Sequence, residues 1–166
     1  SQTFDEARHV EVFNKYLQQR IGMMYPINTY LKSIIDKILT DPRWDMKFIG
    51  MQIVIEGLAL SAFNTTRETT PDPVLKDVVY LVTRDEARHV TFGVNYLEEF
   101  VKTLSDEERE ERALFAYEAC VVARERMIPK DVFHHWGWNV EEARSIYLEG
   151  EFRQMLETLH ELPIVG

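Results

Sequence analysis

The sequence predicts an all-α fold, a bundle of long helices. Nearly every segment repeats apolar residues at helical spacing, as at Val74, Val78 and Val82. Residues typical of helix starts precede several segments, and no run alternates apolar and polar residues between hairpin turns. We therefore expect six helices, at residues 3–22, 28–39, 42–67, 71–103, 106–128 and 139–160.

Local signals justify the boundaries of the later helices. Asp41 and Thr70 each stand before a proline, which is typical of an N-cap followed by the first helical position. The last two helices are bounded by a capping box, a proline stop and a further cap: Ser105 with Glu108, Pro129, and Asn139 with Glu142. The first two helices rest on periodicity alone.

Composition narrows the class of protein. The chain has 166 residues without a low-complexity linker, so we expect one domain over residues 1–166. A net charge of −9 argues against a nucleic-acid partner, which would favour a basic surface. The single cysteine, Cys120, cannot form an intrachain disulfide, and together with the lack of a signal-peptide pattern it favours the cytoplasm.

One stretch, residues 48–66, is about long and apolar enough to cross a membrane. Glu56 lies near the middle of this stretch, and burying a carboxylate at the centre of a bilayer is costly. We therefore expect a buried helix of a soluble bundle, with no membrane span and with Glu56 facing a partner inside the protein.

A repeated hexapeptide indicates chemistry. Residues 5–10 and 85–90 both read DEARHV, 80 positions apart, while the sequence between them does not repeat. Three residues along a helix turn the chain by about 300°, so the Glu and His of each copy share a face. Two such helices facing each other can hold two metal ions, with Glu56 as the natural carboxylate to bridge them. The alternatives are solvated surface pairs for the motifs, and for Glu56 either a protonated core acid or a packing partner of an Arg.

Glu-x-x-His, a lone Glu in an apolar helix and a second Glu-x-x-His together resemble the ferritin-like di-iron carboxylate proteins. The resemblance covers roughly residues 1–100 and implies a ferritin-like helical bundle. It also implies five metal ligands: Glu6, His9, Glu56, Glu86 and His89.

The Asp before each motif Glu is typical of the oxidases in this family. By resemblance, Asp5 and Asp85 hydrogen-bond the metal-binding His of the opposite helix and fix its tautomer. Arg8 and Arg88 then neutralise these aspartates.

The ligand set is one carboxylate short of the family pattern, which places a further Glu on a preceding helix. The chain lacks an initiator Met and starts in mid-pattern, so we expect truncation of the domain at its N-terminus. The alternative is Glu118, in an apolar stretch of a later helix.

Single positions separate the branches of the family. Phe13 stands where ribonucleotide reductase small subunits carry a radical tyrosine, and Leu60 stands where bacterial multicomponent hydroxylases place a Thr. Val82 replaces the third His of the arylamine N-oxygenases. Even so, residues 82–93 are similar to the N-oxygenase-like and other uncharacterised oxidase branches, with a ribonucleotide-reductase-small-subunit-like protein as the alternative.

The resemblance implies an O2-dependent oxidase or oxygenase with two iron ions, manganese being the alternative metal. Its partners would be O2, a small organic substrate and an external reductase or ferredoxin, and the protein would be a monomer or homodimer. The rival classes are a ferroxidase or iron-storage bundle and a non-catalytic scaffold. The cluster of His and Trp at residues 134–138 lacks acidic neighbours at ligand spacing, and we expect a packed turn there.

Overall fold

The computed structural model describes residues 1–126, 130–135, 137–142, 145 and 157. Over these residues the chain is helical and has no strand, as predicted. The helices in chain order are α1 (Gln2–Tyr16), η1 (Leu17–Ile21), α2 (Thr29–Thr40), α3 (Trp44–Phe48), η2 (Ile49–Ile55), α4 (Glu56–Thr69), α5 (Pro73–Val101), α6 (Asp106–Arg126) and α7 (Lys130–His135). Most of the helix expected at residues 139–160 lies outside the described residues.

Helix caps were predicted with mixed success. The capping box is confirmed, since the backbone N–H of Glu108 donates to Ser105 Oγ and that of Ser105 donates to Glu108 Oε2. The predicted caps at Asp41 and Thr70 are wrong by two residues. Asp41 instead accepts from the N–H of Arg43 in a turn before α3, and α5 is capped by Asp72.

Two π-helical segments interrupt the predicted continuous helices. η1 follows α1, and η2 joins α3 to α4 within the helix expected at 42–67. A π-helix widens the turn, and such segments are frequent at functional sites. η2 ends immediately before Glu56, the lone carboxylate of this apolar region.

The apolar core lies where α2, η2, α5 and α6 meet. Ile38, Ile49, Ile53 and Leu97 are almost fully buried there. Burial of such side chains contributes about 1.5–3 kcal/mol each. A buried ion pair between Arg112 of α6 and Asp45 of α3, with Nε–Oδ2 at 2.8 Å, borders this core.

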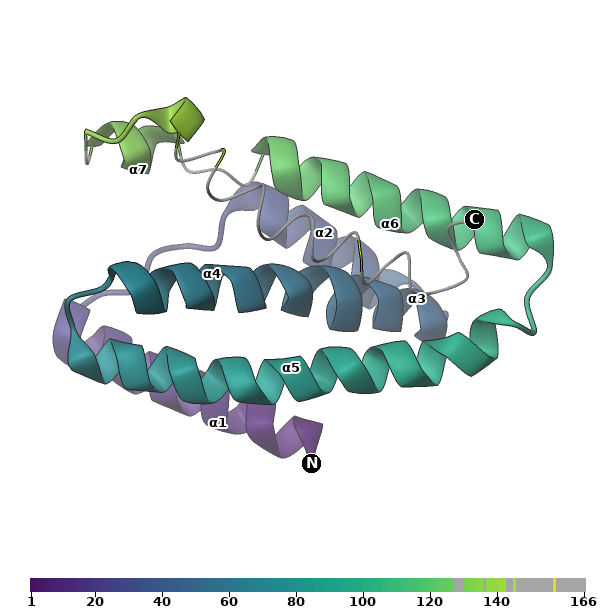
Figure 1. Cartoon of the computed structure of the whole chain (residues 1–166), viewed down its shortest axis with the longest axis horizontal. Helices are drawn as coiled ribbons and strands as arrows, with labels where there is room; N and C mark the ends of the chain where they lie inside the picture. Colours follow the sequence, from purple (N-terminus) through teal and green to yellow (C-terminus); the bar gives the residue numbers. More distant parts are fainter. Residues whose placement is uncertain (127–129, 136, 143–144, 146–156, 158–166) are drawn as a thin grey trace.

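The helices that carry the repeated hexapeptides lie side by side. α4 and α5 run antiparallel along each other, and α1 lies against α5 (Figure 1). Gly93 lets α5 approach η2 closely, because a Cβ on Gly93 would lie 2.5 Å from the Cβ of Gln52. The two Glu-x-x-His copies and Glu56 are thereby brought to one place.

The segment expected to form a packed turn begins as the end of a short helix. His134 and His135 lie in the last turn of α7, and Gly137 then adopts a φ of 69°. The N–H of Trp138 donates to the carbonyl of Phe133, and the two rings pack at 5.6 Å. Trp136 lies outside the described residues.

One described helical stretch, Trp44–Thr69, is long and apolar enough to cross a membrane by length and composition. The core helix of a water-soluble protein passes the same test, so this finding is weak evidence for a span.

Candidate metal centre

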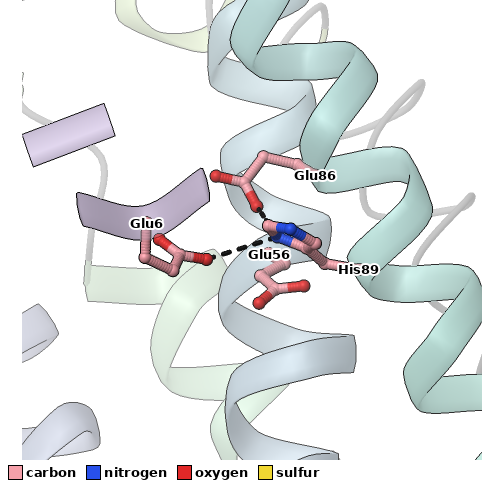
Figure 2. A group of neighbouring side chains, drawn as sticks. All are labelled: Glu6, Glu56, Glu86 and His89. Carbon is pink, nitrogen blue, oxygen red and sulfur yellow. Dashed lines mark hydrogen bonds and ion pairs between the residues drawn. The ribbon is translucent and has the colours of Figure 1, made fainter. Parts of the chain in front are cut away.

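Three helices bring the expected ligands together. Figure 2 shows Glu6 from α1, Glu56 from the start of α4, and Glu86 and His89 from α5 converging on one point. One ligand atom from each of these four residues lies within 4.8 Å of the others. The cluster is inside the bundle, since Glu56, Glu86 and His89 are buried, whereas the Glu6 side chain is 46% exposed.

The fifth expected ligand, His9, joins the cluster through two carboxylates. His9 Nδ1 lies 3.2 Å from Glu86 Oε1 and 3.7 Å from Glu6 Oε2. His89 Nδ1 lies 2.9 Å from Glu86 Oε2 and 3.2 Å from Glu6 Oε1. Glu6 and Glu86 therefore each present one oxygen to each imidazole.

The role expected for Glu56, a carboxylate that bridges the two metal ions, stays a prediction. The carboxylates that contact both imidazoles are those of Glu6 and Glu86, the glutamates of the hexapeptides. Glu56 shares the 4.8 Å cluster with His89, and His9 is not part of that cluster. Sequence spacing placed Glu56 near the motifs but could not show on which side of them it lies.

Each motif aspartate contacts the histidine of the other helix. His9 Nε2 lies 3.1 Å from Asp85 Oδ2, and His89 Nε2 lies 3.3 Å from Asp5 Oδ2. An ionised carboxylate only accepts, so Asp85 and Asp5 favour a proton on each Nε2. A metal ion bound at the glutamates would then meet the lone pair of each Nδ1. Hydrogen bonds from His9, Arg88 and Arg8 hold the pKa of Asp85 down at about 2, against the opposing effect of burial.

Two arginines balance the aspartates. Arg8 Nη2 lies 3.0 Å from Asp5 Oδ1 and also contacts Asp85 Oδ2. Arg88 Nη2 contacts Asp85 Oδ1 and lies 3.6 Å from Asp5 Oδ2. The two hexapeptides thus form a pseudo-symmetric set of charges in which each Arg serves both aspartates.

Glu56 is a strongly perturbed carboxyl group. Gln2 and Gln52 each donate an Nε2–H bond to its Oε1, at 2.9 and 2.8 Å. Burial and the nearby Glu86 and Glu6 carboxylates raise its pKa to about 9. Burial and Glu6 also raise the pKa of Glu86.

The cluster fits a metal ion by its donors and by its orphaned atoms. Glu56 Oε2 and His9 Nδ1 are buried and find no hydrogen-bond partner among the described residues. Such atoms cost free energy unless something satisfies them. Carboxylate oxygens with imidazole nitrogens form a donor set suited to iron or manganese.

Other residues singled out by sequence lie elsewhere. Glu118, the alternative ligand, is on the exposed face of α6, where its Oε2 accepts from Lys37 Nζ at 3.1 Å. Phe13, at the radical-tyrosine position, stacks on Phe63 at 5.5 Å. Gln2 and Gln52 were missed, although Gln52 stands one turn before Glu56 in an otherwise apolar stretch.

Comparison with known proteins decides the family. A model of the family described as P-aminobenzoate N-oxygenase AurF matches residues 2–161, nearly the whole chain. The chain belongs to the AurF family. No curated protein and no solved structure matches it.

AurF-family membership establishes the coarse assignment. The family is an all-α, ferritin-like family of di-iron oxygenases, which makes the chain an oxidoreductase of that general type. The cluster of Glu6, Glu56, Glu86 and His89 can hold a metal ion, as a di-iron family requires. Of the branches considered from the sequence, the family match supports the N-oxygenase-like one.

Proposed function

We propose that this AurF-family chain is a dinuclear-iron oxygenase that uses O2 to oxidise a small organic substrate. The observation that carries the proposal is the convergence of four carboxylate and imidazole groups within 4.8 Å inside a helical bundle. Glu6, His9, Glu56, Glu86 and His89 would hold the metal. Two bound iron ions would supply the one-electron chemistry and open coordination positions that dioxygen activation needs.

The chain's own part is to set the donor atoms. Asp85 and Asp5 keep a proton on Nε2 of each histidine, so that both Nδ1 atoms stay available as ligands. Glu6 and Glu86 each face both imidazoles, which suits carboxylates shared by two ions. Burial of Glu56, Glu86 and His89 strengthens the charge interactions among them.

The family description suggests an aromatic amine bearing a carboxylate as substrate. A pocket of about 310 Å³ adjoins the centre at His9. Its lining includes apolar residues and charged residues: Val12, Val78, Leu81, Arg84, Arg8, Arg88 and Asp85. An apolar wall with a cation suits a single ring carrying an acid group.

Insertion of one oxygen atom into a substrate while the other becomes water consumes two electrons and two protons. We propose that a separate reductase or ferredoxin supplies the electrons to a monomer or homodimer. This requirement separates an oxygenase from an iron-storage bundle, which oxidises iron without an organic substrate.

The test measures O2 uptake by the iron-loaded chain with p-aminobenzoate and a reduced ferredoxin. The proposal predicts uptake that depends on the amine, with an N-oxygenated product found by mass spectrometry. Arg84→Ala should raise KM at least tenfold with little change in kcat, while Lys76→Ala, away from the pocket, should change neither. Uptake that is independent of any organic substrate would overturn the oxygenase assignment.

A further inference from the structure

The two oxygens of the Glu56 carboxylate have unlike surroundings. Oε1 accepts two hydrogen bonds, from Gln2 Nε2 at 2.9 Å and from Gln52 Nε2 at 2.8 Å. Oε2 is buried and has no hydrogen-bond partner in the described part of the chain. One oxygen is therefore fully engaged by neutral donors, and the other is left bare inside the site.

We propose that Gln2 and Gln52 form an amide clamp that makes Glu56 a metal ligand through Oε2 alone. The proposal rests on the proposed function, because it needs a metal at the cluster. Hydrogen bonds to Oε1 draw electron density from that atom and fix the plane of the carboxylate. Oε2 keeps its lone pairs, and coordination satisfies an atom that is otherwise costly to bury.

Gln52 itself gives independent evidence that the clamp has a cost. Its Oε1 is also buried without a hydrogen-bond partner among the described residues. If the amide were turned over, Gln52 Oε1 would face Glu56 Oε1, and two acceptors would meet. The observed orientation leaves Gln52 Oε1 without a partner but lets Gln52 Nε2 donate to Glu56. An unsatisfied buried oxygen of this kind needs an explanation, and the hydrogen bond that Gln52 Nε2 donates to Glu56 supplies one.

The backbone around Gln52 holds the clamp in place. Gln52 lies in the π-helical η2, one turn before Glu56, and opposite Gly93 of α5. Because a Cβ on Gly93 would lie 2.5 Å from Gln52 Cβ, the two helices fix the start of the Gln52 side chain. Gln2 approaches from α1, so the clamp joins two helices that also carry ligands.

The clamp is tested first on the metal-free chain. Nuclear magnetic resonance of ¹⁵N-glutamine side chains should show slow deuterium exchange at the amides of Gln2 and Gln52, and Glu56→Ala should abolish this protection. Gln18, whose amide donates to Asn14 on the exposed surface, is the matched control and should exchange fast in both proteins. Fast exchange at Gln52 in the unmodified chain would overturn the clamp.

The ligand atom is tested with Zn²⁺, which is redox-inert. Gln52→Leu, close in size to Gln, should weaken zinc binding about ten- to a hundredfold without lowering the Tm of the metal-free chain. Gln18→Leu should leave zinc binding unchanged. Infrared difference spectra should show a single-oxygen carboxylate mode that disappears in Glu56→Gln and shifts toward a two-oxygen mode in Gln52→Leu.

The outcomes separate the two proposals. Protected amides in a chain that does not bind zinc would contradict the proposed function. The hydrogen bonds of Gln2 and Gln52 would then be structural only, and their role in positioning a ligand would be overturned as well. Zinc binding that Gln52→Leu does not weaken would overturn the inference alone.

Discussion

Asp85 on α5 accepts a hydrogen bond from Nε2 of His9 on α1, at 3.1 Å. Asp5 on α1 stands in the same relation to His89 on α5, at 3.3 Å. Each hexapeptide therefore supplies the aspartate that orients the histidine of the other. Together with the glutamates that contact both imidazoles and the arginines that pair with both aspartates, this exchange gives a role to Asp, Glu, Arg and His, the four polar letters of the hexapeptide.

Loss of one aspartate should weaken the whole centre. In Asp85→Ala, His9 loses its acceptor and Arg8 loses one of its partners, so we expect zinc affinity to fall about ten- to a hundredfold. Isothermal titration calorimetry measures the effect. Asp77→Ala, an exposed aspartate of the same helix, is the control. Equal affinities in the two variants would show that the contact with His9 has no role in binding.

Glu56 should make the folding stability of the metal-free chain fall as the pH rises from about 4.5 to about 9. Its pKa of about 9 in the folded chain exceeds the ordinary value of 4.5, so below pH 4.5 it is protonated in both states and has no effect. Between pH 4.5 and 9 the unfolded chain ionises more readily, and folding stability falls as pH rises.

Glu56→Gln should remove this loss while abolishing metal binding. We expect a Tm higher by roughly 4 °C or more at pH 8, with no gain at pH 4, measured by circular dichroism without metal. Glu118→Gln, at an exposed carboxylate, should show no such pH-dependent gain. A Tm at pH 8 equal to that of the unmodified chain would contradict the raised pKa of Glu56 in the folded chain.

Gly93 should be needed for the site as well as for packing. Gly93→Ala places a methyl against Gln52 Cβ and should cost about 1–3 kcal/mol of unfolding free energy. Gly50→Ala makes a comparable clash with Ile38 in the core and is the matched control. Urea unfolding and zinc titration on both proteins should show similar stability losses but weaker zinc binding only in Gly93→Ala. If zinc affinity is unchanged in Gly93→Ala, the close packing of α5 on η2 is not needed for metal binding, and the prediction is wrong.

Replacing one partner of the Arg112–Asp45 ion pair should lower the free energy of unfolding more than replacing both. Arg112→Met leaves Asp45 buried without its cation and should cost about 3–5 kcal/mol. Adding Asp45→Leu should recover most of that loss, because the desolvated charge is then gone. Urea unfolding of the two single variants and the double variant gives the answer; additive losses would contradict it.

Much of the fold could be predicted because helices leave local marks. Apolar period and capping chemistry located α2, α5 and α6 to within two or three residues. The π-helical η1 and η2 carry no such mark, since their wider hydrogen bonding depends on packing rather than on residue type. The starts at Asp41 and Thr70 were misplaced because each side chain can close a turn before the helix as well as cap it.

The part of the candidate site that could be predicted is the part formed by the repeated charged residues. The hexapeptide brought Glu6, His9, Glu86 and His89 into view, and burial of a lone carboxylate added Glu56. Gln2 and Gln52 were missed because a neutral amide belongs to no motif. The sides on which Glu6, Glu86 and Glu56 lie depend on how α1 and α5 cross, which sequence does not state.

Anaerobic titration with ferrous iron, read as iron bound per chain after gel filtration, tests the central claim most directly. The account predicts binding that stops at two irons per chain, and little or none in a Glu6→Ala, Glu86→Ala double variant. No bound iron in the unmodified chain, equal binding in the double variant, or uptake that continues far beyond two would contradict it.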